Sequence, residues 1–322
     1  MDLSINLAPN NTTGLIVKNP IMIASGTFGY DGYGSGIPDG MDLSQLGAII
    51  PKTVTRHSRE GNPEPRWYPT SYREAKEQNE CIYLNSIGLA NPGIEAALSD
   101  LAPIWATWSA TVILSLSANS PSEFAEMSAM TKGVVGFEAL ELNLSCPNIE
   151  SGALFAHSAD LTYEVVKAVK ANSDLPILVK LAPNVPDIVP IARAAESAGA
   201  DALTISNTNP AMLVDTSSKA PVLGAITGGL SGPGLHPIAL ALVYQSFQAV
   251  TIPIIGVGGI FSAEEALRFM LCGASSVQIG SANLADLWAP IGILEDLTAR
   301  LEGQEVSNLE EVIGITHNRI PA

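Results

Sequence analysis

PIIGVGGIFSAEEALRFMLCGASSVQIGS, residues 253–281, decides the fold of this chain. An apolar run over 253–259 leads into a helical pattern over 263–272, and a second apolar run follows over 276–281. Ser262 with Glu264-Glu265 is typical of a helix start, and Gly273 is typical of a helix end. The stretch therefore predicts a strand, a helix and a second strand, the repeating unit of α/β folds with a parallel sheet.

The same unit recurs along the chain. Short β-rich runs occupy 20–25, 47–54, 111–116, 139–145, 176–181, 201–206, 253–259 and 276–281. Helical patterns lie between most of them: one opens at Ser120 with Glu123 placed for a capping box, and others run over about 159–172, 185–198, 236–249 and 263–272. We predict a (β/α)8 TIM barrel, one domain over 1–322. A doubly wound open sheet is the rival, but no GxGxxG follows the first strand.

Three stretches depart from this alternation. Residues 1–19 predict a small β-hairpin around Asn10-Asn11 that closes the bottom of the barrel. Residues 55–83 are polar, rich in Pro and Arg, and too long for a simple connection, so we expect a functional loop. A third excursion spans 208–231 and includes PVLGAI, 221–226, as an extra strand. The last two would lie at the C-terminal rim.

Composition and charge narrow the class of protein. The 322 residues are 47% hydrophobic and only 15% charged, and the net charge is −16. Nucleic acids and anionic membranes need a basic surface, so neither is expected as a partner. The three cysteines, Cys81, Cys146 and Cys272, suit neither a disulfide framework nor a metal site. With no leader or apolar span evident, we expect a reduced, cytoplasmic protein without a bound metal.

Glycines follow the last two predicted strands. Gly258 and Gly259 end the seventh run, and Gly280 with Ser281 ends the eighth. Phosphate sites in TIM barrels form at these two loops, where backbone N–H groups approach the ligand closely. Ordinary turn glycines are the alternative for each position alone, but two such pairs favour a phosphorylated cofactor.

ELNLSCPN, residues 141–148, places a thiol at the end of the fourth strand. Pro147 stops the strand one residue after Cys146, and Asn143 and Asn148 supply amides beside it. A small buried apolar residue is the alternative for Cys146. Lys52 and Lys180 lie within apolar strand runs, where an ammonium needs a bound anion or a carboxylate inside the barrel to offset its burial.

These pieces together resemble the class 1 dihydroorotate dehydrogenases, most closely the class 1B catalytic subunits. The resemblance covers nearly the whole chain. It rests on ASGTFG (24–29), PKTVT (51–55), REGNPEPR (59–66), LNSIGLANPG (84–93), ELNLSCPN (141–148), VKLAPNV (179–185), SNT (206–208), GGLSGP (228–233), PIIGVGGI (253–260) and GSAN (280–283).

The resemblance implies an FMN-dependent oxidation of dihydroorotate to orotate in pyrimidine biosynthesis. Cys146 would remove the C5 proton as the catalytic base while a hydride passes from C6 to FMN. The implied cofactor-binding residues are Ser25, Lys52, Thr53, Asn143, Lys180, Ser206, Gly232, Gly258, Gly259, Gly280 and Ser281. The implied substrate-binding residues are Lys52, Asn85, Ser86, Ile87, Gly88, Leu89, Asn143, Asn207 and Thr208.

The chain departs from the family pattern at several positions. Ser115 replaces an asparagine, Ser206 an isoleucine and Ser281 a threonine, and 67–83 is longer than the usual link. A pyrimidine oxidoreductase of the dihydropyrimidine dehydrogenase type and a non-catalytic barrel subunit therefore stay open as alternatives.

The resemblance to class 1B also implies a partner. Such catalytic subunits pair with an electron-transfer subunit that carries FAD and an iron–sulfur cluster and reduces NAD. This chain has no cysteine cluster of its own, so the relay would come from that partner. We expect a homodimer, and leave fumarate or another electron acceptor open.

Overall fold

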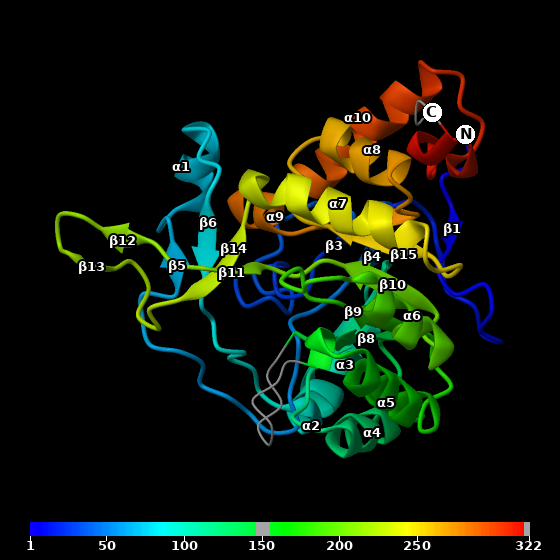
Figure 1. Ribbon diagram of the computed structural model, residues 1–322, viewed down its shortest axis with the longest axis horizontal. Coiled ribbons are helices and arrows are strands. Elements are labelled where there is room, and N and C mark those ends of the chain that lie inside the picture. The colour runs from blue at the N-terminus through cyan, green and yellow to red at the C-terminus, as the bar shows by residue number, and fades with distance from the viewer. Residues whose placement is uncertain (146–154, 319–322) are drawn as a thin grey trace.

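A closed barrel of eight parallel strands forms the centre of the molecule (Figure 1). The computed structural model describes residues 1–145 and 155–318. In barrel order the strands are β3 (Ile21–Ile23), β4 (Ala48–Ile49), β7 (Thr111–Leu116), β8 (Ala139–Asn143), β9 (Ile177–Lys180), β10 (Ala202–Ile205), β15 (Ile254–Val257) and β16 (Ser276–Ile279). Each lies within one of the eight predicted runs. The TIM-barrel prediction is confirmed, and the open doubly wound sheet was the wrong alternative.

Helices cover the outside of the barrel (Figure 1). The main ones are α4 (Pro121–Met130), α5 (Ala159–Lys170), α6 (Val189–Ser197), α7 (His236–Phe247), α8 (Ala263–Leu271) and α10 (Ala289–Glu302). A continuous helical segment runs through α2 (Ile94–Ala96), a π-helical turn (Ala97–Leu101) and α3 (Ala102–Trp105). The helical patterns in the sequence located α4, α5, α6, α7 and α8, whereas α10 was not predicted.

Helix caps follow the sequence signals with one difference. Ser120 Oγ accepts from the backbone N–H of Glu123 at the start of α4, as a capping box requires. The Glu123 carboxylate, however, accepts from the backbone N–H of Asn119 and not from that of Ser120. The chain turns tightly before Ser120, which brings the earlier N–H within reach.

The N-terminal hairpin closes the bottom of the barrel, as expected. Strands β1 (Ile5–Asn6) and β2 (Ile16–Val17) pair antiparallel, and Leu7, Leu15 and Val17 are buried in the main core. Asn11 in the connecting turn donates to the Asp201 carboxylate at the amino end of β10.

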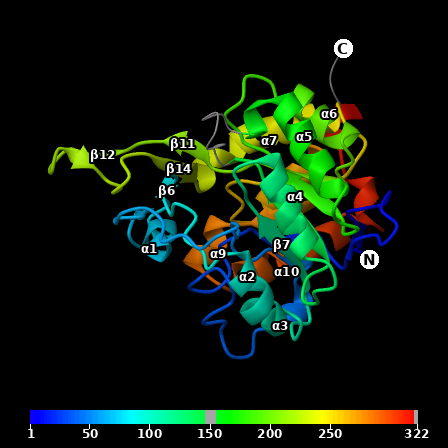
Figure 2. The same ribbon diagram turned by 90° about the horizontal axis from the view of Figure 1, so that it is seen from below.

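The two long excursions meet in a second sheet above the rim. Its order is β11 (Asn209–Ala211), β14 (Gly228–Ser231), β6 (Tyr83–Asn85) and β5 (Trp67–Tyr68), all antiparallel. A hairpin of β12 (Val214–Asp215) and β13 (Ala220–Pro221) extends from it, and both views show this arm projecting from the barrel (Figures 1 and 2). We call the four strands the rim sheet.

Two sequence expectations need correction here. Residues 55–83 are not a plain loop, because they contain β5, α1 (Tyr72–Glu77) and the start of β6. PVLGAI is not a strand: only Pro221 belongs to one, and residues 222–226 form bends and turns before β14. The glycine-rich Gly228–Ser231 takes the strand position, because its small residues allow close pairing with β6.

Within 1–145 and 155–318, no helix is both long enough and apolar enough to cross a membrane.

Asp201 joins three parts of the barrel's lower end. Its buried carboxylate accepts from Lys170 Nζ at 2.7 Å, from the backbone N–H of Ile177 at 2.7 Å and from Asn11 at 3.4 Å. Loss of this carboxylate leaves a half-buried ammonium and a buried N–H without their partner.

We expect Asp201→Ala to lower the free energy of unfolding by about 3 kcal/mol, since charged hydrogen bonds and buried ion pairs contribute on that order. Urea denaturation followed by circular dichroism measures this loss. Asp174→Ala, at an exposed position nearby, is the matched control and should stay within about 0.5 kcal/mol of the parent. Equal midpoints for the two variants would show that Asp201 does not anchor the lower end.

Candidate active site

A hollow of about 180 Å³ opens at the rim where the barrel strands end. A second, more open hollow of about 520 Å³ adjoins it. Both are lined by Ser25, Lys52, Asn85, Ile87, Lys180 and Asn207. The carboxyl ends of the strands of a TIM barrel are where its active sites lie, so these two hollows form the candidate site.

Glycines shape one wall of the first hollow. Gly259 has a φ of +62°, and a Cβ atom there would lie 2.6 Å from the carbonyl oxygen of Gly232. Gly258 has a φ of +145°, and its Cβ would lie 2.8 Å from that of Ala239. Only glycine fits these two positions, so the loop after β15 presents bare backbone to the hollow. Gly280 differs, because a Cβ there would make an ordinary 3.6 Å contact with Ala24.

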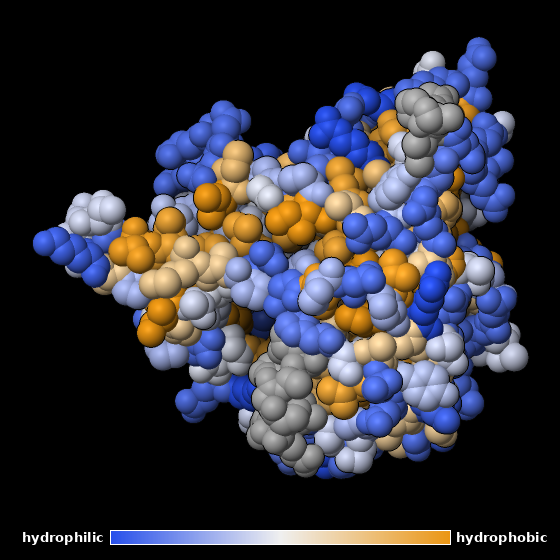
Figure 3. Space-filling view, in the orientation of Figure 1, coloured by the Kyte–Doolittle hydropathy of each residue, from blue (hydrophilic) through white to orange (hydrophobic). Residues whose placement is uncertain are grey.

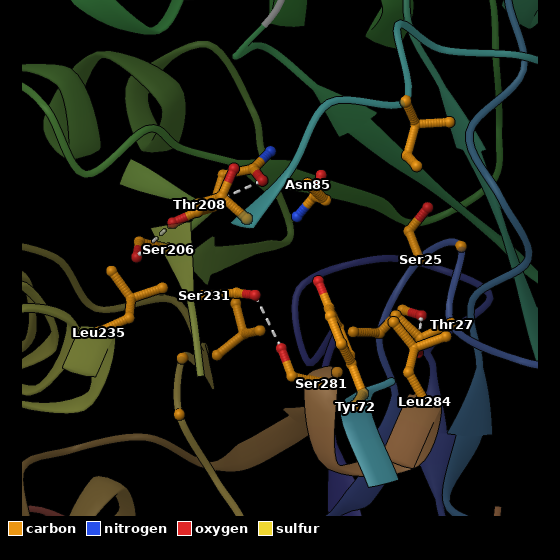
Figure 4. A pocket seen from close by; sticks show the side chains of 18 of the residues that line it. Ser25, Thr27, Tyr72, Asn85, Ser206, Thr208, Ser231, Leu235, Ser281 and Leu284 are labelled. Carbon is orange, nitrogen blue, oxygen red and sulfur yellow. Dashed lines mark hydrogen bonds between the residues drawn. The ribbon is translucent and has the colours of Figure 1, made fainter. Parts of the chain in front are cut away.

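Small hydroxyl side chains complete this wall. Ser281 begins the short helix α9 (Ser281–Ala285), and its Oγ donates to Ser231 Oγ of β14 at 2.9 Å (Figure 4). The bond ties the last barrel strand to the rim sheet. The hollow thus has glycine backbone and hydroxyl groups where the sequence predicted a phosphate site.

Three hydroxyl groups form a chain across the first strands. Thr53 Oγ1 lies 3.0 Å from Ser25 Oγ and 2.8 Å from Ser115 Oγ. Thr53 and Ser115 are buried, while Ser25 lines both hollows. Ser115, which departs from the family's asparagine, therefore reaches the site through Thr53 and not by direct contact with either hollow.

An amide cluster lies between β8 and β10. Asn207 Nδ2 donates to Asn143 Oδ1 at 3.2 Å and to Ser145 Oγ at 2.6 Å, and Ser145 Oγ donates to Asn143 Oδ1 at 2.6 Å. All three residues line the second hollow. Such a cluster can bind a planar ring that carries both N–H and C=O groups.

The predicted substrate residues gather at the second hollow. It is lined by Lys52, Asn85, Ser86, Ile87, Gly88, Leu89, Asn143 and Asn207. Thr208 lines the first hollow instead. Asn62 holds this segment in place, because its Nδ2 donates to Ser86 Oγ at 2.8 Å and its backbone packs closely against Gly88.

Most predicted cofactor residues gather at the first hollow. It is lined by Ser25, Lys52, Lys180, Ser206, Gly258, Gly259, Gly280 and Ser281. Thr53 and Asn143 line the second hollow, and Gly232 lies behind the wall against Gly259. Cys146 lies outside the described residues; the structure describes the chain as far as Ser145, one residue before it.

Lys52 and Lys180 line both hollows, and we call them the floor of the site. Their surroundings differ. Burial, and to a smaller extent the positive charge of Arg66, lowers the pKa of Lys52 below its ordinary value of 10.5. Lys180 Nζ instead lies 3.8 Å from the carboxylate of Glu141, which is fully buried in β8. A carboxylate inside the barrel was the alternative considered for both lysines, and the structure places one beside Lys180.

Sequence reasoning missed two groups of residues near the site. Trp67 and Tyr72, from the long 67–83 stretch, line the first hollow. Tyr72 is buried, and its hydroxyl donates to the carbonyl of Leu84 at 3.2 Å. The unusual length of 67–83 was the available signal. Glu141 and Gln278 are the second group; they are polar residues inside strand runs, and a buried polar residue is itself informative.

A TIM barrel whose rim collects lysines, amides, hydroxyls and bare glycine backbone is typical of enzymes that hold a phosphorylated cofactor. Comparison with known proteins agrees. The sequence model of the family described as dihydroorotate dehydrogenase matches residues 8–301.

Relatives match over nearly their whole length. The chain is 42% identical over 305 residues to a protein of Desulforudis audaxviator, covering 94% of this chain and 95% of that one. It is 40% identical over 314 residues to a protein of Geotalea uraniireducens, with 97% of each covered, and 40% identical over 309 residues to one of Porphyromonas gingivalis, with 95% and 97% covered. All three are named dihydroorotate dehydrogenase B (NAD(+)), catalytic subunit.

The chain therefore belongs to the dihydroorotate dehydrogenase family. Members are flavin-dependent oxidoreductases that bind FMN and oxidise dihydroorotate to orotate in pyrimidine biosynthesis. The first hollow suits this cofactor: the two positions where only glycine fits give a phosphate bare N–H groups, and the lysines of the floor suit a ring that gains negative charge.

The lowered pKa of Lys52 leads to a prediction about pH. A carboxylate ligand such as orotate, bound beside Lys52 as the sequence predicts, would favour the ammonium form and so raise the pKa of Lys52. The affinity for orotate should be greatest at pH values below the pKa that Lys52 has in the orotate-free protein. Above that pKa the affinity should fall by up to tenfold per pH unit. Because this pKa is lowered, the fall should begin below pH 10.5. Orotate titrations of the FMN-bound protein, followed by flavin absorbance, measure this curve.

Lys52→Gln should weaken orotate binding about tenfold or more at neutral pH and flatten the curve, because the titrating charge is gone. Lys76→Gln, at an exposed lysine that pairs with Asp286 outside both hollows, is the control and should keep the parent curve. An unchanged curve in Lys52→Gln would assign the pH dependence to another group.

Proposed function

We propose that this chain is the catalytic subunit of an NAD-linked dihydroorotate dehydrogenase, a single FMN-binding barrel domain with Cys146 as the base. The observation that carries the proposal is the division of the rim into two adjoining hollows. One gathers most of the residues expected to bind FMN, and the other gathers most of those expected to bind the pyrimidine.

The second hollow suits dihydroorotate. The ring N–H and C=O groups of dihydroorotate match the acceptors and donors of Asn143 and Asn207. The Ser145 hydroxyl holds these two side chains in one cluster. The carboxylate of dihydroorotate matches the Lys52 ammonium. Burial lowers the pKa of Lys52, and a bound anion would raise it again. The segment 85–89 would cover the opposite side with backbone groups. These contacts orient the ring and exclude water.

Cys146 would remove the C5 proton. It comes three residues after Asn143, so the strand that contributes to the amide cluster also leads to the thiol. The thiolate takes up the proton as the C5–H bond breaks, and its efficiency depends on a thiol pKa near the working pH. FMN, when bound, supplies the acceptor for the hydride that leaves C6.

Residues of the first hollow, together with Thr53 and Gly232 beside it, would hold FMN at both ends. Gly258, Gly259 and Ser281, with Gly232 and Gly280, would bind the phosphate through backbone N–H and hydroxyl groups. Ser25, Thr53, Lys180 and Ser206 would lie along the ring. The Ser115 hydroxyl is hydrogen-bonded to that of Thr53, which gives a physical role to this departure from the family pattern.

A protein partner would pass electrons on to NAD. The relatives are named as NAD(+)-linked catalytic subunits, which supports a separate electron-transfer subunit with FAD and an iron–sulfur cluster. Met212, Val214 and Ile226, within and beside the β12–β13 hairpin, are exposed apolar side chains. Apolar surface is visible on the projecting arm (Figure 3), which supports protein contacts there, either in a homodimer or with that subunit. Cys81 and Cys272 are free thiols, which supports a cytoplasmic location.

We expect Cys146→Ser to keep FMN but to lose at least about 100-fold in the rate at which dihydroorotate bleaches the flavin at neutral pH, because general-base catalysis contributes on that order. Anaerobic stopped-flow absorbance measures the rate, and the absorbance of the resting protein measures FMN content.

Cys81→Ser is the matched control, since this exposed thiol lines neither hollow, and its rate should equal that of the parent. An undiminished rate in Cys146→Ser would place the base elsewhere. Bleaching by dihydrouracil and not by dihydroorotate would overturn the proposed substrate.

A further inference from the structure

A fully buried carboxylate lies one layer below the floor of the site. Glu141 is at the centre of β8, and none of its surface is exposed. It lies two residues before Asn143, which pairs with Lys180 across β8 and β9. Residues two apart on a strand share a face, so Glu141 points into the barrel directly beneath the pair that lines the hollows.

The two oxygens of Glu141 have different surroundings. Oε2 accepts from Gln278 Nε2 of β16 at 2.7 Å and from Thr204 Oγ1 of β10 at 3.1 Å. Oε1 accepts no hydrogen bond within the described part of the chain and faces Lys180 Nζ at 3.8 Å. The carboxylate is thus held by one oxygen, and its other oxygen is directed at the ammonium.

The Lys180 ammonium lies between this carboxylate and the site. The side chain of Lys180 is 8% exposed, and the residue lines both hollows. At 3.8 Å the ammonium is beyond hydrogen-bond distance of Oε1 but within strong electrostatic reach in a buried setting. Its N–H groups therefore remain available to a ligand, while its charge is already offset from below.

We propose that Glu141 is a positioning residue for the cofactor: it fixes the Lys180 ammonium at the floor and offsets its charge. It thereby limits how strongly the site favours negatively charged reduced FMN over neutral oxidised FMN. The inference rests on the proposed placement of FMN in the first hollow.

Electrostatics fixes the direction of the effect. Among the described residues, Glu141 is the one carboxylate that pairs with Lys180, so removing its charge leaves the ligand as the group that offsets the ammonium in this part of the chain. Oxidised FMN brings no charge on its ring and reduced FMN brings a negative one, so binding of the reduced form gains relative to the oxidised form. Removal of the Lys180 charge should instead weaken binding of reduced FMN relative to oxidised FMN.

The test is the ratio of the affinities of the protein for reduced and oxidised FMN, obtained from the midpoint potential of the bound cofactor. In Glu141→Gln, which keeps the shape and removes the charge, this ratio should rise at least tenfold, equivalent to about 30 mV for a two-electron couple. Ser276→Ala is the matched control: it removes a buried polar group of β16 that contacts Met22 and lies outside both hollows, and it should leave the ratio unchanged.

A double-mutant cycle tests the coupling through Lys180. Lys180→Met should lower the ratio, and Glu141→Gln added to it should change the ratio little, since the proposal has Glu141 act through an ammonium that this background lacks. An unchanged ratio in Glu141→Gln with FMN bound, or an equal rise in the Lys180→Met background, would overturn the inference.

Folding of the variants is informative too. If Glu141→Gln fails to fold while the double variant Glu141→Gln/Lys180→Met folds, the carboxylate is needed only opposite a charged Lys180, as proposed. Failure of both would give Glu141 a structural role independent of Lys180 and overturn the inference. Parent protein that binds no FMN would instead refute the proposed function, so the two failures are distinguishable.

Discussion

Closure of the parallel sheet is the constraint on which this structure depends. An open edge would leave backbone N–H and C=O groups without partners, and here β10 pairs with β15 and β16 pairs with β3, so no edge remains within the barrel. Closure brings all eight carboxyl ends to one rim. Residues as distant in sequence as Ser25 and Ser281 become neighbours, and the binding groups rest on rigid strands.

The interior of such a barrel makes every polar group costly unless it is paired. Glu141 and Lys180 meet this requirement together, with Thr204 and Gln278 binding the remaining oxygen. At Lys180 the floor of the site is therefore a pair of opposite charges and not a lone cation. The arrangement depends on residues from four strands, β8, β9, β10 and β16, so a substitution on any one of them would disturb it.

Local signals made much of the fold predictable. The eight strand runs, the helix starts at Ser120 and Ser262, and the glycines after the last two strands depend on neighbours in sequence. The rim sheet was not predictable in this way, because β6 pairs with a strand more than 140 residues later, and nothing local to Gly228–Ser231 indicates it. Glu141 was overlooked for a related reason: its partners come from three other strands. The role of Cys146 stays a prediction from sequence.

Strand β5 lies at the outer edge of the rim sheet, and this position determines which parts of the site can change without affecting the barrel. An added edge strand needs only one neighbour, so the extra length of 67–83 joins β6 without altering the register of any barrel strand. This stretch adds Trp67 and Tyr72 to the lining of the first hollow. The side of the first hollow that 67–83 forms can therefore change in length and composition without a shift of any barrel strand.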